Sequence, residues 1–139
     1  MYTSVNRRMK NDIRNVFVKR SFIYFCVSMF CALFGGIYEI FSHGVYSSYM
    51  IYAFLFPLIG GTLYNLVLYI IQGIKLQNGM SLIFYNTGIA ALTLGSIIRG
   101  ILDIYGTDNV LANVYRYAGT VLILTGIVFY ILDKEGVRR

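Results

Sequence analysis

Residues 21–42 read SFIYFCVSMFCALFGGIYEIFS, and this stretch decides the fold. It holds a single charged residue, Glu39. An α-helix rises ~1.5 Å per residue, so the stretch covers about 33 Å and can cross the ~30 Å hydrocarbon core of a bilayer. A run this long and this apolar is typical of a membrane-spanning helix and not of the core of a water-soluble protein.

Three further apolar stretches follow the first one. The four expected spans are residues 21–42, 49–73, 80–105 and 111–132. Their connectors are short, which forces neighbouring spans to run in opposite directions. We therefore expect an all-α polytopic membrane protein, an antiparallel four-helix transmembrane bundle. The expected division is a basic segment at 1–20, a transmembrane domain at 21–135 and a short tail at 136–139.

The basic residues lie almost entirely outside the apolar stretches. Of the twelve Lys and Arg residues, six fall within residues 1–20 and three follow the last span. Because Lys and Arg in short flanking segments stay on the cytoplasmic side, we expect a multi-pass protein of the cell membrane with both termini in the cytoplasm. The net charge of +6 is therefore a topology signal and does not indicate nucleic-acid binding.

The segment before the first span has the pattern of a short amphipathic helix. Met9, Ile13, Val16 and Phe17 recur at helical spacing, and basic or polar residues fill the positions between them. Such a helix lies in the headgroup layer and binds anionic lipids. The alternative is that it binds a regulatory partner.

Each span carries one stripe of small or polar residues. In lipid no hydrophobic force drives helices together, so small residues and interhelical hydrogen bonds indicate which faces meet. In the second span, Pro57 with Gly60 and Gly61 predicts a kink, because proline removes a backbone donor and crowds the preceding turn. The kink is either static or a hinge for gating.

Two asparagines are expected to make polar contacts between helices. Asn65 and Asn86 fall at similar depth toward the cytoplasmic side. Asn86, however, lies about 140° around its helix from Arg99, at ~100° per residue. We therefore hypothesise that Asn86 bonds to a second subunit.

The ionisable residues within or beside the spans gather toward the outer side. They are Glu39, His43, Arg99, Asp103 and Arg116. A charge at the centre of a membrane helix costs on the order of 3 kcal/mol, so such residues are retained for pairing or for function. Asp103 follows Arg99 by four residues, so the two can meet on one helix face, and His43 can reach Glu39 if the helix continues that far.

Two interpretations of this cluster stay open. Two arginines and two carboxylates sum to zero, so Glu39, Arg99, Asp103 and Arg116 can form a network that only locks helices together. Alternatively, they line a polar pocket near the outer face in which Glu39 and His43 exchange protons, since histidine titrates closest to neutral pH. The cluster meets no metal-ligand spacing rule, and we expect neither a metal nor a cofactor.

Known catalytic motifs are missing from the chain. It has no Gly-rich phosphate loop, no H-E-x-x-H and no G-x-S-x-G, so we do not expect an enzyme. The expected function is that of a small transport-type protein for a solute or ion, and the alternative is a non-catalytic accessory subunit of a larger membrane complex. Four spans enclose little volume by themselves, so a homo-oligomer or a larger complex is expected.

Overall fold

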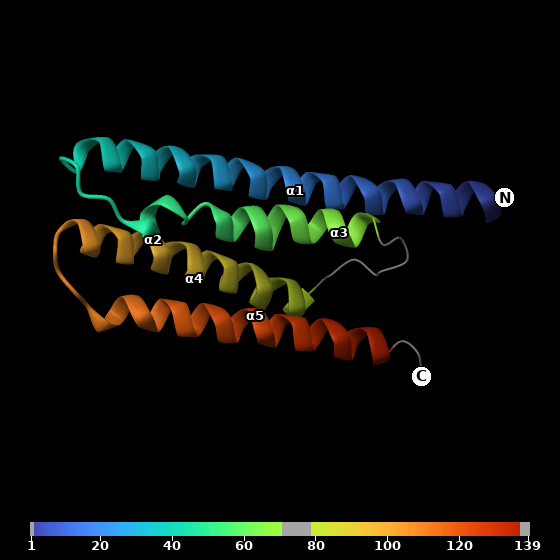
Figure 1. Ribbon diagram of the computed structural model, residues 1–139. Coiled ribbons are helices and arrows are strands. Elements are labelled where there is room, and N and C mark those ends of the chain that lie inside the picture. The colour runs from blue at the N-terminus through green and yellow to red at the C-terminus, as the bar shows by residue number, and fades with distance from the viewer. Residues whose placement is uncertain (1, 71–78, 137–139) are drawn as a thin grey trace.

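Helices make up nearly all of the structure (Figure 1). The computed structural model of the chain describes the backbone of residues 2–70 and 79–136 and the side chains of residues 4–70 and 79–133. The elements are α1 (Tyr2–Phe41), α2 (Ser48–Ile51), the π-helix η1 (Phe56–Leu63), α3 (Tyr64–Ile70), α4 (Gly79–Ile104) and α5 (Val110–Gly136).

Four segments of the described chain are helical, long and apolar enough to cross a membrane. They are Ser4–Phe41, Ser48–Ile70, Gly79–Ile104 and Val110–Asp133. This finding supports the prediction of an all-helical membrane protein, and each segment contains most of one expected span. The expected end of the second span, at residues 71–73, lies outside the described residues.

The first helix is continuous from the basic segment into the first apolar stretch. α1 has 40 residues, so at ~1.5 Å per residue it is about 60 Å long. Residues 2–34 contain neither Gly nor Pro, and nothing in the sequence breaks the helix there. Its N-terminal turns extend beyond the described ends of α3 and α4 (Figure 1).

The second span is divided into α2, η1 and α3. Pro57 lies in the first turn of η1 and has no backbone N–H, so the regular hydrogen-bond ladder cannot run through it. The backbone takes the wider π-helical turn instead, and Gly60 and Gly61 lie within it. A Cβ at Gly61 would lie 2.1 Å from the Tyr24 ring, so this position needs glycine to let α1 approach. Whether the segment acts as a hinge stays a prediction.

The helices pack in the order of the chain. α1 packs against η1 and α3, the second span packs against α4 through α2 and η1, and α4 shares its largest interface with α5. Figure 1 shows the chain passing back and forth with these helices side by side. No extensive interface joins α1 to α5 in the described part of the chain, so the helices form an open row. α5 lies at the edge of this row.

Glycines at seven-residue spacing hold α4 and α5 together. A Cβ at Gly88 would lie 2.9 Å from the carbonyl oxygen of Gly119, and one at Gly119 would lie 3.0 Å from that of Gly88. A Cβ at Gly126 would lie 2.8 Å from a backbone nitrogen of α4. The Ser81 hydroxyl donates to the Gly126 carbonyl at 2.7 Å. Such close backbone approach is how small residues join membrane helices.

The short helix α2 is wedged between α1 and α4. Its Met50 side chain is 1% exposed. A Cβ at Gly35 of α1 would lie 3.1 Å from the Met50 carbonyl oxygen, and one at Gly100 of α4 would lie 2.9 Å from the Met50 nitrogen. The Ser96 hydroxyl also donates to the Tyr49 carbonyl at 2.7 Å. These contacts fix α2 at one end of the row.

Candidate functional site

Two groups of polar side chains lie at opposite ends of the row of helices. We call the end that holds the connectors 42–47 and 105–109 the connector end (Figure 1). The end that holds the start of α1 and the end of α5 is the terminal end.

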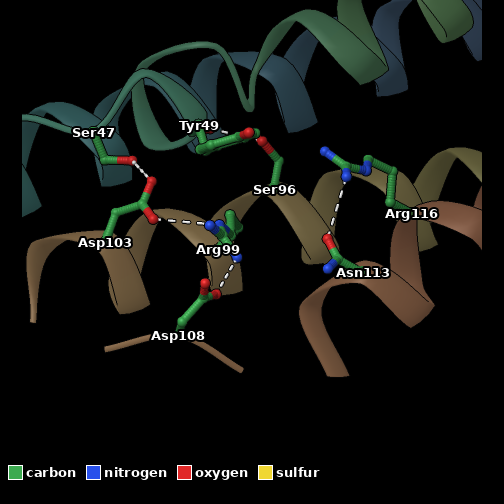
Figure 2. A network of polar contacts seen from close by, with 8 residues as sticks. All are labelled: Ser47, Tyr49, Ser96, Arg99, Asp103, Asp108, Asn113 and Arg116. Atoms are coloured by element: carbon green, nitrogen blue, oxygen red, sulfur yellow. Dashed lines mark hydrogen bonds and ion pairs between the residues drawn. The ribbon is translucent and has the colours of Figure 1, made fainter. Parts of the chain in front are cut away.

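The connector-end network links charged side chains of α1 and α4 with both connectors. Arg99 Nε lies 3.3 Å from Asp103 Oδ1, as their four-residue separation allows, and Arg99 Nη1 also pairs with Asp108 (Figure 2). The Ser47 hydroxyl donates to Asp103 Oδ2 at 3.0 Å. The Ser47 backbone N–H donates to Glu39 Oε1 at 3.4 Å. Ser47 therefore bridges the two carboxylates.

The charges of the connector-end network do not sum to zero. It joins three carboxylates, Glu39, Asp103 and Asp108, to one guanidinium, Arg99. Arg99 also lies over the Tyr49 ring, with its Cζ 5.7 Å from the ring centroid, which is within range of a cation–π contact. The sequence-based expectation of a zero sum did not include Asp108, which lies in a connector and pairs with Arg99.

Arg116 is not part of the connector-end network. Its Nη2 donates to Asn113 Oδ1 at 3.2 Å, one turn earlier on α5 (Figure 2). Across residues 4–70 and 79–133, no ion pair involves Arg116. The guanidinium bonds to a residue of its own helix, α5. The interpretation in which Arg116 joins Glu39, Arg99 and Asp103 in one network is therefore corrected.

His43 does not share a helix face with Glu39. α1 ends at Phe41, so the condition for their i, i+4 contact is not met. His43 is exposed in the turn that follows and has φ 56°, a left-handed conformation that few non-glycine residues adopt. The expected pairing of these two residues is thereby corrected.

The terminal-end pocket is a cavity of about 230 Å³ where α1, α3 and α4 meet. Its polar lining residues are Arg20 and Tyr24 from α1, Tyr64 and Asn65 from α3, and Tyr85 and Asn86 from α4. None of the lining residues among the described side chains, 4–70 and 79–133, is acidic. The structure thus brings the two predicted asparagines to one cavity.

Hydrogen bonds orient both asparagines within the chain. The Tyr24 hydroxyl donates to Asn86 Oδ1 and so joins α1 to α4. Tyr24 of α1 thus supplies one partner of Asn86 within the chain, and a bond from Asn86 to a second subunit stays a prediction. Asn65 is buried, and its Nδ2 donates to the Gly61 carbonyl at 2.7 Å.

Tyr85 closes one side of the terminal-end pocket. Its hydroxyl donates to the Gly60 carbonyl in η1 at 2.6 Å. Its ring stacks on that of Tyr64, with 4.6 Å between the ring centroids. The side chain is therefore held at both its ring and its hydroxyl, and it is 5% exposed.

A larger groove of about 570 Å³ runs beside the second span. Its walls come from α2, η1, α4 and α5 and are mainly apolar and aromatic, with Tyr49, Tyr52, Phe56 and Ile89 among the lining residues. Tyr85 also lines this groove. One side chain thus belongs to both the groove and the terminal-end pocket.

The sequence did not lead us to predict that the tyrosines of the terminal-end pocket line a common site, although a signal for this was present. The dipeptide Tyr–Asn occurs at residues 64–65 and again at residues 85–86, at similar depth on the second and third spans. Neutral side chains that form hydrogen bonds join helices within a membrane. A pair of them repeated on adjacent spans therefore indicates a polar site between those spans. Arg20 was counted only as a topology signal.

Comparison of the chain with protein-family models, with curated proteins and with solved structures returns no match. Among the described residues, no three His, Cys, Asp or Glu side chains are placed to hold a metal ion.

Proposed function

We propose that the chain is a small transport-type membrane protein that moves an amphiphilic, lipid-like molecule across the bilayer. The observation that supports this most is the double position of Tyr85, which lines both the apolar groove and the polar terminal-end pocket. The groove would hold the apolar part of the substrate, and the pocket would hold its polar headgroup.

The irregular backbone of the second span supports this choice of path. At membrane depth, non-regular backbone is tolerated where it lines a cavity, and π-helical turns are frequent at functional sites. Gly60 lies in η1, lines the groove and accepts the hydrogen bond of Tyr85. We propose that bending at Pro57, Gly60 and Gly61 moves Tyr85 and so opens the groove to the pocket.

The proposal includes an orientation in the membrane. The four helices cross the cell membrane as an antiparallel row with both termini in the cytoplasm, because the basic residues concentrate at the terminal end. The terminal-end pocket then faces the cytoplasmic leaflet, and Lys19 and Arg20, which immediately precede the first expected span, lie near its anionic lipids. The connector-end network faces outward and acts as a lock that holds α1, α4 and both connectors.

A translocation assay tests this function with the full chain in liposomes. The probe is fluorescent phosphatidylglycerol in both leaflets, and dithionite is added outside to reduce the outer-leaflet dye. Protein-free liposomes retain the inner-leaflet signal, whereas we expect the protein to expose that signal to dithionite as well. Retention equal to that of protein-free liposomes would contradict the proposal.

Two matched substitutions locate the path. Ile59 lines the groove and is 55% exposed, whereas Leu63, one turn later in η1, is 48% exposed and is not among the groove-lining residues. Ile59→Trp should fill part of the groove and slow translocation at least about fivefold, an effect of roughly 1 kcal/mol. Leu63→Trp should leave the rate within about twofold. Equal rates for the two variants would remove the groove from the mechanism.

A second function, as an accessory subunit of a larger membrane complex, is favoured by the exposure of α5. In the described part of the chain, α5 has an extensive interface with α4 alone, and only 11% of its most apolar 18 residues are buried. A partner helix would cover that surface. In this case the protein extracted in mild detergent should elute with other subunits, and the isolated chain should not translocate the lipid probe.

A further inference from the structure

The lining of the terminal-end pocket selects for negative charge. Arg20 is half-buried and lines the cavity, where it contributes a permanent positive charge. The other lining side chains that the structure describes are tyrosine, asparagine and aliphatic, and none of these is acidic. A ligand that enters the pocket therefore meets a positive potential and hydrogen-bonding groups together.

The orientation of Asn86 adds hydrogen-bond donors to this charge. Tyr24 donates to the amide oxygen of Asn86. The amide nitrogen, with its two N–H groups, is then the part of Asn86 that a ligand can use. An oxyanion has only acceptors to offer at neutral pH, so it matches an arginine and an amide nitrogen better than a neutral or cationic group does.

The size and place of the pocket fit a headgroup. Its volume of about 230 Å³ equals that of about eight water molecules at ~30 Å³ each, which is less than a drug-sized solute needs. Arg20 immediately precedes the expected first span, near the depth of a membrane surface. Five more basic residues precede it on α1: Arg7, Arg8, Lys10, Arg14 and Lys19.

We propose that the terminal-end pocket binds the phosphate group of an anionic ligand, with Arg20 as the counter-charge and Asn86 as a hydrogen-bond donor. The fork of N–H donors on a guanidinium matches two phosphate oxygens at once. The phosphate belongs either to a phospholipid headgroup or to a soluble phosphate ester. The lipid source rests on the proposed transport function, whereas phosphate binding itself does not.

Binding is measured at equilibrium, so that its outcome is separate from that of the translocation assay. The full chain in detergent micelles is titrated with phosphatidylglycerol or phosphatidylcholine, and bound lipid is counted by native mass spectrometry. We expect phosphatidylglycerol to bind at least about tenfold more tightly, because its headgroup is a net anion, whereas the choline cation of phosphatidylcholine offsets the charge of its phosphate beside Arg20. Equal affinities would overturn the proposal.

Two neighbouring basic residues provide a matched pair of variants. Arg20 lines the pocket, whereas Lys19 is exposed and is not among the lining residues. Arg20→Gln should weaken phosphatidylglycerol binding about tenfold or more, and Lys19→Gln should weaken it less than about twofold. An equal loss in both variants would show that the lipid responds only to the diffuse charge of α1 and would overturn the proposal.

A second pair keeps the test valid if Arg20→Gln does not fold. Asn86→Asp retains an oxygen that accepts from Tyr24 but replaces the amide donors with a negative charge. We expect it to abolish the preference for phosphatidylglycerol. Asn15→Asp, at an exposed position on α1, adds the same charge outside the pocket and should change binding less than about twofold. Retained preference in Asn86→Asp would overturn the proposal.

Competition identifies the source of the phosphate. Glycerol 3-phosphate is added to the phosphatidylglycerol complex of the unmodified protein. Displacement supports phosphate binding with a soluble ester as ligand. Binding that persists supports phosphate binding with a lipid as ligand, since the acyl chains then contribute. If lipid binds but is not translocated in liposomes, the transport function fails and the phosphate site stands.

Discussion

The connector-end network and the terminal-end pocket are both polar, but they use their polar groups differently. In the network, Arg99 contacts two carboxylates and Ser47 bridges to a third, so the charges are engaged with one another. In the pocket, hydrogen bonds orient neutral side chains around a cavity of about 230 Å³. Mutual contacts hold helices in place, whereas oriented groups around a cavity can bind a ligand.

The largest effect is expected from a substitution that disturbs packing at the connector end and leaves the terminal-end pocket unchanged. Gly100→Val adds a Cβ that would lie 2.8 Å from Met50 Cβ and 2.9 Å from the Met50 nitrogen, so α2 must move. We expect the free energy of unfolding in detergent to fall by about 3 kcal/mol. Gly36→Ala is the control, because nothing lies within 4 Å of its added Cβ. The folded fraction should still bind phosphatidylglycerol. Loss of this binding would show that the connector end and the terminal-end pocket are coupled.

The next effect tests whether the connector-end network is a lock. Arg99→Leu leaves Glu39, Asp103 and Asp108 without their guanidinium, and we expect a loss of about 2 kcal/mol in stability, discounted for the partial exposure of the side chains. Arg116→Leu removes an equal charge that bonds to Asn113, and should cost less than about 0.5 kcal/mol. Unfolding titrations of the two variants give the comparison. Equal losses would contradict the lock.

A smaller effect should appear at the terminal end. Tyr24→Phe removes the hydroxyl that holds Asn86, so we expect about 1 kcal/mol of destabilisation and weaker phosphatidylglycerol binding. Tyr115→Phe, an exposed position on α5, is the control and should change neither quantity. Unfolding titrations and native mass spectrometry report the two quantities. Unchanged lipid binding in Tyr24→Phe would show that Asn86 needs no positioning.

The smallest effect concerns the histidine that lies apart from the network. His43 has φ 56°, which glycine adopts readily, so His43→Gly should leave stability unchanged or raise it by less than about 1 kcal/mol. If His43 were the proton partner of Glu39, the same change would alter the pH dependence of translocation. Unfolding titrations and translocation rates between pH 5 and pH 8 distinguish the two roles.

The sequence predicted the helices well because their signal is local. Apolar length and composition place the last three spans within a few residues of the helical segments observed, whereas the first helix begins at Tyr2, well before the expected start at residue 21. Pro57 predicted an irregular second span, because a residue without a backbone N–H breaks the helical hydrogen bonds at its own position. Gly88, Gly95 and Gly119 belong to the small-residue stripes of the third and fourth spans, and they lie where α4 and α5 approach each other.

The arrangement of the helices and the pocket could not be predicted in the same way. His43 and Glu39 seemed adjacent by spacing, but the helix ends two residues before His43. Asn86 seemed to face away when its angle was taken from Arg99, yet the row of helices places Tyr24 against it. The end of a helix is a local feature that residue spacing alone does not give, whereas the contact between Tyr24 and Asn86 depends on packing between distant segments.

Labelling of single cysteines tests most directly whether the two ends lie on opposite sides of the membrane. In a background with Cys26 and Cys31 replaced by alanine, Thr107→Cys reports on the connector end and Asn11→Cys on the terminal end. The reagent is a membrane-impermeant maleimide added to intact and to lysed cells. We predict that Thr107→Cys is labelled in intact cells and Asn11→Cys only after lysis. Labelling of Asn11→Cys in intact cells would contradict the account.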